Sequence, residues 1–391
     1  MNKLRPEPDS NQTISPYQAF AVVFSSMVGV GVLSLPRDVG QFTGNDMLWV
    51  IVLSGLFVWV VSALISWLCR RFPAMSVVQF APIILGREKS DRVGKLLSVP
   101  FLLAVVLFWV GGIAISTRVF GEVVVTAVLV NTPIEAIMLV FLVAGAFAAG
   151  SHPAVIAKFN EFLLPTMFVP ILLYVISIVQ RGEMMNLFPL FQTNWMMVLK
   201  GVLSASYSYA GYKVIMMFSG FYAKPDKGFK AHSAAVLAAT FIYWFTCLTS
   251  LSVFGKDEIS KILVPVLEVV KAINLKALVF ERLESAILGI WLIAVFTTIV
   301  NLQTSFVQMV MEFFRLRERT RRWVSLLMVP VLYRLAVLPS NVKQVGTYAS
   351  WMGIYSLAVA IIVPGILLII SLIRKKKGGA QIEASSAQGR A

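Results

Sequence analysis

Long apolar runs, each bounded by charged residues, recur along nearly the whole length of this 391-residue chain. A helix needs about 20 residues to cross the ~30 Å of hydrocarbon in a bilayer, and most of these runs reach that length. Hydrophobic residues make up 58% of the chain and charged residues only 14%, whereas about a quarter of the residues of a soluble domain are charged. The chain is therefore expected to form one all-α integral membrane domain, with lipid as its main solvent.

Ten membrane spans are expected where apolar runs lie between charged segments. They fall near residues 15–39, 48–68, 99–120, 134–149, 154–179, 195–221, 233–254, 286–311, 323–337 and 348–373. The membrane domain is thus predicted over 15–373, with tails at 1–14 and 374–391, and the low hydrophobicity of the second tail predicts disorder. An even number of spans places both termini on one side of the membrane.

Basic residues indicate which side that is. The chain has 34 Lys and Arg against 19 Asp and Glu, a formal net charge of +15. The basic residues are scattered over short loops instead of clustered on one polar element, so no nucleic-acid partner is expected. They concentrate after spans 2, 6, 8 and 10, and short basic loops are not readily translocated. Both termini are therefore predicted to be cytoplasmic.

The connection at 255–282, on the opposite side, is long and amphipathic. Its apolar residues recur at helical spacing, while Lys261, Glu268 and Lys271 fall on another face. The apolar set is Ile259, Ile262, Leu263, Val266, Leu267, Val270 and Ile273. The pattern predicts an amphipathic helix over the outer mouth of the bundle, which either packs there for stability or acts as a lid for gating or partner docking.

Spans 1 and 6 each carry a helix-weakening segment in the middle of the membrane. Span 1 contains Gly29 and Gly31 followed by Pro36, and span 6 contains the segment SASYSYAGY at 204–212. Backbone groups freed in hydrocarbon are tolerated only where they face protein, water or a ligand. Interruptions at positions 1 and 6 indicate a five-plus-five inverted repeat with a binding site between the halves. The alternative is that the small residues only allow close helix packing.

Residues 29–36, GVGVLSLP, resemble the signature in the first helix of the amino acid, polyamine and organocation transporter superfamily. A narrower resemblance, to the B-subunit permeases of spore germinant receptors, rests on several short segments in a fixed order. These are ISPYQ at 14–18, LPR at 35–37, KFNE at 158–161 with Pro165, and FERLE at 280–284. This family implies a leucine-transporter-like fold and a subunit that recognises a small germinant, commonly an amino acid. It also implies a receptor complex with a larger A subunit and a C-subunit lipoprotein in the spore inner membrane.

The resemblance also implies where the germinant binds, namely in a mid-membrane pocket between helices 1, 3, 6 and 8. Backbone amides at the start of the second half-helix of span 1 are suited to an anion such as a carboxylate, so the germinant carboxylate is expected against Gly29, Val30 and Gly31. The expected walls are Phe108, Trp109, Tyr207, Ser208, Tyr209, Gly211, Tyr212, Thr297 and Thr298. For the aromatic residues, ordinary packing is the alternative.

Ionisable groups inside a bilayer are expensive and mark candidate functional positions. Glu161 in span 5 is expected to pair with Lys158 on its own helix or with Lys213 of span 6, as a structural ion pair or as a proton or conformational switch. Lys158 can also snorkel to the cytoplasmic interface. Thr297 and Thr298 could form a sodium site with carbonyls of span 1, or their hydroxyls could bond back to their own helix.

Two classes of function share these features. No Ser/His, cysteine or carboxylate grouping stands at catalytic spacing within a span, and His152 and His232 are isolated, so an enzyme is not expected. No cofactor or metal-ligand pattern is present in the sequence. The chain is predicted to be a germinant-sensing receptor subunit; the alternative is a proton- or sodium-coupled amino acid permease, which would use the same fold and pocket.

Overall fold

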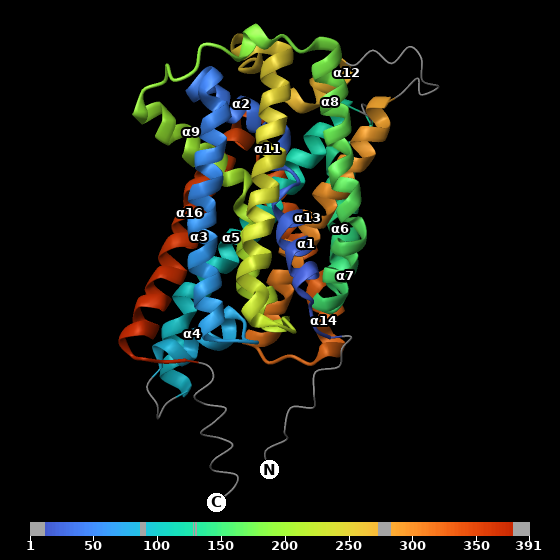
Figure 1. Cartoon of the computed structure of the whole chain (residues 1–391). Helices are drawn as coiled ribbons and strands as arrows, with labels where there is room; N and C mark the ends of the chain where they lie inside the picture. Colours follow the sequence, from blue (N-terminus) through green and yellow to red (C-terminus); the bar gives the residue numbers. More distant parts are fainter. Residues whose placement is uncertain (1–11, 87–90, 128, 130, 273–282, 378–391) are drawn as a thin grey trace, which may run out of the picture.

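The computed structural model describes residues 12–86, 91–127, 129, 131–272 and 283–377, and these form a helical bundle (Figure 1). The first five spans are α1 (Pro16–Met27) with α2 (Gly31–Thr43), α3 (Met47–Arg71), α5 (Asp91–Ala127), α6 (Ile134–Ala149), and α7 (Pro153–Leu163) with η2 (Leu164–Phe168) and α8 (Val169–Arg181). The second five are α9 (Trp195–Ser208) with η4 (Ala210–Val214) and α10 (Ile215–Phe218), α11 (Gly228–Ile259), α13 (Leu283–Phe313), α14 (Arg321–Leu327) with α15 (Val329–Val337), and α16 (Val342–Ile373).

Each predicted span coincides with one of these helices or broken helices, so the ten-span, all-helical prediction is confirmed. Among the described residues, six helical segments are long and apolar enough to cross a membrane by themselves. The remaining spans are the 16-residue helix α6 and those that the chain divides into shorter pieces. The described residues contain no β-strand, only a single bridge between Ile14 and Tyr222.

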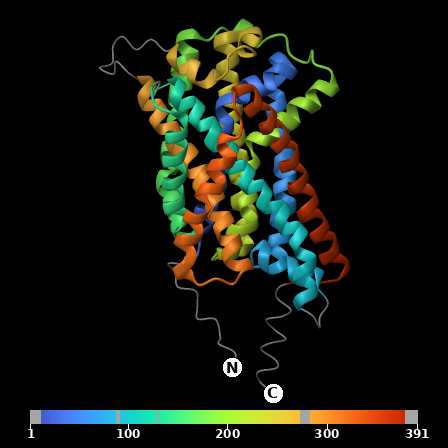
Figure 2. The same cartoon turned by 180° about the vertical axis from the view of Figure 1, so that it is seen from behind.

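The two broken spans lie together in the middle of the bundle. α1 packs against α11 and η4, and α2 packs against α9 and α11. On the other side α5 crosses the bundle obliquely and packs against α13 and α16 (Figure 2). The interruptions of spans 1 and 6 are therefore enclosed by protein on several sides, as buried irregular backbone in a membrane requires.

The start of α1 and the end of α16 lie at the same end of the bundle, together with α4 (Val77–Leu85) and α14 (Figure 1). The α4 helix packs against α16 at this end of the bundle. Arg374 donates to the carbonyls of Leu85 and Gly86 at 2.9 and 3.0 Å, and Lys376 donates to Ile83 at 2.8 Å. Basic side chains thus satisfy the free carbonyls at a helix C-terminus, where positive charge is favourable.

The outer connection differs from its prediction. The helix expected over 259–273 is shorter: α12 spans Pro265–Lys271, and α11 runs on to Ile259 before a turn. Pro265 explains the boundary, because proline is accepted at the first position of a helix but cannot continue one from the preceding turn. The apolar face of α12 is buried, including Val266, Leu267 and Val270. Residues 273–282, and most of both predicted tails, lie outside the described residues.

Candidate functional site at the interruption of span 1

The helix of span 1 stops at Met27 and starts again at Gly31. This leaves main-chain carbonyls without the intrahelical partners of a continuous helix. Side chains of α11 and α13 supply donors to them. The Tyr243 hydroxyl donates to the Met27 carbonyl at 2.7 Å, and the Trp291 indole nitrogen donates to the Gly29 carbonyl at 3.2 Å. The Thr298 hydroxyl donates to the Ser25 carbonyl at 2.7 Å.

Span 6 is interrupted directly beside this point. Its helix α9 ends at Ser208 and gives way to the 3₁₀ turn η4. The Ser208 carbonyl accepts from the same Tyr243 hydroxyl, at 2.9 Å. A hydroxyl carries one proton, so Tyr243 shares a single donor between the two interruptions. It therefore links the broken helices of both halves through α11.

The glycines of the two interruptions allow the backbones to touch. A Cβ at Gly31 would stand 2.7 Å from the Ser208 Cα, and one at Gly211 would collide with the Ser26 carbonyl. A Cβ at Gly29 would collide with the Thr298 hydroxyl. The small residues therefore serve close packing and also interrupt the helices. The space beside Gly31 is filled by Ser208 in this arrangement, so a ligand carboxylate enters only if spans 1 and 6 separate.

The predicted aromatic walls do not form one surface. Tyr209 stacks edge-on against Tyr243, with ring centroids 4.6 Å apart, and its hydroxyl donates to Thr240 at 3.3 Å. Tyr207 packs toward Gly353 of α16. Trp109 is fully buried in α5, and its indole nitrogen finds no hydrogen-bond partner among the described residues.

Phe108 and Tyr212, two of the predicted walls, enclose the Lys213 ammonium. The Lys213 Nζ lies 4.3 Å from the Phe108 ring centroid and 4.7 Å from that of Tyr212. It also donates to the Ala210 carbonyl at 3.1 Å and to the Ser356 hydroxyl at 2.7 Å. Lys213 is 1% exposed, and in the described part of the chain no carboxylate forms an ion pair with it. A cation buried among neutral partners is costly.

The structure gives Glu161 a hydrogen-bond partner that the sequence did not predict. Its carboxylate accepts from the Gln18 side-chain amide at 2.8 Å, and no ion pair between described residues joins it to Lys158 or Lys213. The reason is directional: Glu161 faces α1 from α7, whereas Lys213 faces α5 and α16 from the interruption of span 6. Glu161 is only half-buried and Lys158 is exposed. They are the ninth and sixth of the 29 residues from Pro153 to Arg181, so both lie nearer the start of span 5 than its middle.

Two segments that carried the family resemblance meet at this contact. Ser15 caps α1 by accepting from the Gln18 amide at 3.2 Å, and the Gln18 side chain accepts from the Ser15 amide at 2.9 Å. This capping box fixes the start of α1. The same Gln18 side chain then reaches Glu161. Asn160, beside Glu161, forms a reciprocal pair of amide hydrogen bonds with Asn301 of α13 at 2.8 and 2.9 Å.

The threonines of span 8 bond to protein oxygens. The Thr297 hydroxyl donates to the Ala294 carbonyl of its own helix at 2.9 Å, and the Thr298 hydroxyl shares its one proton between that carbonyl, at 3.1 Å, and the Ser25 carbonyl. The Asn301 amide donates to the Ser26 hydroxyl at 2.9 Å. The Ser25 carbonyl and the Ser26 hydroxyl, two span 1 oxygens that a sodium ion could use here, thus already accept hydrogen bonds from protein donors. Within the described residues, no group of three or more His, Cys, Asp or Glu side chains is placed to hold a metal ion.

A small apolar cavity of about 50 Å³ adjoins the interruption. It is bounded by α2, α5, the middle of span 5, α11, α12 and α13. Val28 and Trp291 line it beside the break, and Val266, Leu267 and Val270 of α12 close it on the outer side. Sequence reasoning missed Tyr243 and Trp291, because only tertiary packing shows which aromatic residue reaches a free carbonyl.

Comparison with known proteins finds relatives among spore germination proteins. A family model described as "Spore germination protein" matches residues 13–345. Spore germination protein YndE of Bacillus subtilis (strain 168) is 25% identical over 364 residues, covering 93% of this chain and 97% of YndE. Spore germination protein GerLB of Bacillus cereus is 22% identical over 383 residues, covering 96% of this chain and 99% of GerLB.

Solved transporters share the fold. Mhp1, a nucleobase-cation-symport-1 family transporter solved in a closed conformation with bromovinylhydantoin, has a TM-score of 0.61 at 12% identity, covering 93% of this chain and 80% of Mhp1. MhsT in complex with L-phenylalanine has a TM-score of 0.57 at 14% identity, covering 91% of this chain and 97% of MhsT. At such low identity the likeness concerns the fold alone.

The broken spans and these neighbours define the class of protein as a leucine-transporter-like membrane protein. Within that class the match over residues 13–345 is decisive. The chain belongs to the spore germination protein family, as the resemblance of its short segments predicted.

Proposed function

We propose that the chain is the germinant-sensing, permease-like subunit of a spore germination receptor, and that it binds a small germinant, an amino acid, where spans 1 and 6 are interrupted. The germinant would lie between helices 1, 3, 6 and 8. The receptor would also contain an A subunit and a C-subunit lipoprotein, in the spore inner membrane with both termini in the cytoplasm. Family membership and the shared placement of the two interruptions support this proposal.

The strongest support comes from the hydrogen bonds at the two helix interruptions. The carbonyls of both broken helices are held by hydroxyl and indole donors from α11 and α13. A germinant that enters the break competes for these groups, so binding and helix displacement are coupled. A sensor requires this coupling, because a ligand shifts an equilibrium only through interactions that differ between two states.

The germinant carboxylate has a defined place in this scheme. Among the described residues no side chain caps α2, which begins at Gly31, so its first amides could bind an anion once Ser208 moves away from Gly31. Pockets for small molecules usually have volumes of ~300 Å³ or more, whereas the cavity beside the break holds about 50 Å³. The germinant side chain therefore fits only after α12 or α13 moves. That movement would be the signal.

The proposal is tested in spores from which the gene has been deleted. Such spores should lose their response to at least one amino acid of a complete panel, and a wild-type copy should restore it. A copy with Trp291→Phe keeps the ring but not the donor to Gly29, so it should change the germinant concentration needed for half-maximal response while abundance is unchanged. A full response of the deletion spores to every amino acid would overturn the proposal.

The alternative, a coupled amino acid permease, is favoured by the solved transporters that share the fold. Proteoliposomes containing the purified chain separate the two functions. Accumulation of a labelled amino acid driven by a proton or sodium gradient would support the permease, whereas binding without accumulation would support the sensor.

A further inference from the structure

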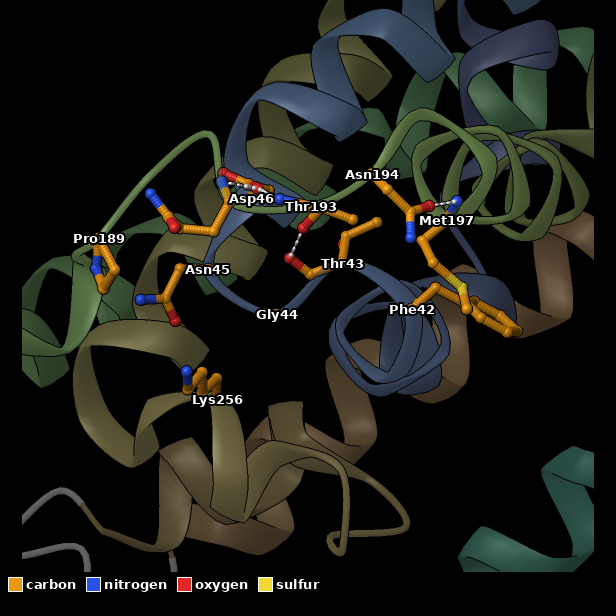
Figure 3. Close-up of a pocket in the computed structure, with 11 residues that line it drawn as sticks. Phe42, Thr43, Gly44, Asn45, Asp46, Pro189, Thr193, Asn194, Met197 and Lys256 are labelled. Atoms are coloured by element: carbon orange, nitrogen blue, oxygen red, sulfur yellow. Dashed lines mark hydrogen bonds between the residues drawn. The ribbon is translucent and has the colours of Figure 1, made fainter.

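A larger cavity, of about 300 Å³ (Figure 3), is lined by elements at the end of the bundle opposite the termini (Figure 1). Its walls come from the end of α2, the short 3₁₀ turn η1 (Gly44–Asp46), the segment before α9, and α11 just after its kink. None of the residues predicted to bind a germinant belongs to it. Its volume is at the lower end of the range for small-molecule pockets.

The walls of this outer cavity are held in place by Asp46. Its carboxylate accepts from the main-chain amides of Phe191, Gln192 and Thr193, the latter two at 2.8 and 2.7 Å, and from the Trp49 indole at 2.9 Å. Burial raises the pKa of Asp46, but the hydrogen bonds from Trp49, Thr193 and Phe191 together outweigh it and hold the pKa below its ordinary value. The segment before α9 is thus fastened to a fixed negative charge.

Asn45, next to Asp46, presents an unsatisfied acceptor. Its side chain lines the cavity and the residue is only 6% exposed, yet its Oδ1 has no hydrogen-bond partner among the described residues. A buried acceptor without a donor costs roughly 1–3 kcal/mol. None of the described residues donates a hydrogen bond to this oxygen in the present arrangement.

Lys256 supplies a cation to the same cavity. Gly255, with φ +70°, kinks α11 and redirects the chain just before Lys256. The Lys256 stem passes over Gly44, where an added Cβ would stand 3.7 Å from its Cδ. Figure 3 shows Lys256 on the side of the cavity that carries Asn45, while Phe42 and Met197 lie across from them. Lys256 joins no ion pair among the described residues.

We propose that the outer cavity binds a small α-amino acid as its zwitterion, with the ammonium on the Asn45 Oδ1 and the carboxylate on the Lys256 ammonium. Both charged groups of such a ligand are attached to one carbon, which suits an acceptor and a cation on one side of a cavity. The Asp46 charge beside Asn45 favours the ligand ammonium. The ligand side chain faces Phe42 and Met197. This site is separate from the interruption of span 1 and does not depend on it.

Thiol labelling tests the proposal on the full-length chain in lipid nanodiscs. The native Cys69 and Cys247 are buried, so a Gln192→Cys variant offers a reactive thiol in the cavity wall, where Gln192 is exposed. Each of the common L-amino acids is tested as a protecting ligand, followed by the carboxamide of any that protects. At least one amino acid should slow labelling, and its carboxamide should not. A Lys261→Cys variant, on the exposed turn outside the cavity, should label at one rate throughout.

Two further variants, Lys256→Met and Asn45→Leu, are each combined with Gln192→Cys. Each should raise the amino acid concentration needed to slow labelling by about tenfold or more, because a charge-assisted or buried hydrogen bond is lost. Lys261→Met is the matched control and should leave it unchanged. If Asn45→Leu does not fold, the result for Lys256→Met decides the proposal, because Lys256 is exposed and its replacement should not disturb folding. The proposal is overturned if no amino acid slows labelling of the Gln192→Cys thiol, or if carboxamides slow it equally. It is also overturned if Lys256→Met keeps full protection of the thiol, or if only an added receptor subunit slows labelling. Protection that is lost in Lys256→Met and Asn45→Leu belongs to the outer cavity, whereas protection that both substitutions leave intact comes from the span 1 interruption, so the two proposals fail separately.

Discussion

Tyr243 shows how a single side chain can hold two interrupted helices. Its one hydroxyl proton is shared between the Met27 and Ser208 carbonyls, and both carbonyls lie where a helix has stopped. Its neighbourhood is packed so closely that glycine is needed at positions 29, 31 and 211. At this scale the site is a direct contact between the backbones of spans 1 and 6, with no space for a ligand in the present arrangement.

Gly31→Leu should abolish the germinant response while the protein stays in the membrane. The new side chain would push the Ser208 backbone away, because even a Cβ would lie 2.7 Å from its Cα, and overpacking typically costs about 1–3 kcal/mol. Germination assays and immunoblots of spore membranes measure the two effects. Gly365→Leu is the matched control, since a Cβ there meets nothing within 4 Å. A normal response of the Gly31 variant would remove span 1 from the site.

Lys213→Met should stabilise the protein and weaken signalling. Methionine keeps most of the apolar stem but removes an ammonium that has only neutral partners, and replacing buried charge with apolar side chains is often stabilising, by about 1–4 kcal/mol. Thermal unfolding in detergent and germination assays are the measurements. Lys200→Met, at an exposed position of α9, should change neither. A lower unfolding temperature would mean that the ammonium contributes to stability after all.

At the scale of elements, the N-terminal end of α1 is held by several hydrogen bonds. The Ile14 amide donates to the Phe221 carbonyl at 2.8 Å, and its carbonyl accepts from the Ala223 amide at 3.0 Å. The Gln18–Glu161 bond ties the first turn of α1 to α7. These contacts hold the half-helix that precedes the interruption, so movement of α1 requires breaking them.

The hydrogen bond between Gln18 and Glu161 predicts the effects of two substitutions at position 161. Glu161→Gln should respond nearly as the wild type, because its side-chain oxygen still accepts from Gln18. Glu161→Leu removes the acceptor and should lower the germinant concentration needed for half-maximal response, since α1 is held less firmly; one hydrogen bond is worth about 1 kcal/mol. Dose–response curves of spore germination measure this. A severe defect in Glu161→Gln would show that the charge itself is required.

For the whole molecule, several apolar side chains at the end of the bundle opposite the termini are largely exposed. Met185, Phe191 and Trp195, in and just after the connection between spans 5 and 6, are 75–83% exposed. The apolar face of α12, by contrast, is buried against the bundle. Exposed apolar patches commonly mark sites of association. The outer connection before α9 is therefore a better candidate for a subunit contact than α12.

The amount of this chain in spore membranes tests whether it assembles with the A subunit. The chain should be depleted from spore membranes that lack the A subunit, because its exposed apolar segment would lose cover. Phe191→Ser should weaken co-purification with the A subunit, whereas Phe162→Ser, at an exposed position of α7, should not. Unchanged abundance without the A subunit would instead favour an autonomous permease.

The sequence by itself determined the membrane class, the ten spans and the interruptions of spans 1 and 6. These follow from local properties, since twenty apolar residues cross a bilayer and glycines weaken a helix wherever they stand. The tertiary structure alone decided which groups meet there. Glu161 bonds to Gln18 instead of a lysine, the predicted aromatic walls separate, and Tyr243 and Trp291 hold the free carbonyls. Such contacts depend on how helices distant in sequence cross and rotate, and the periodicity of one chain does not encode that directly.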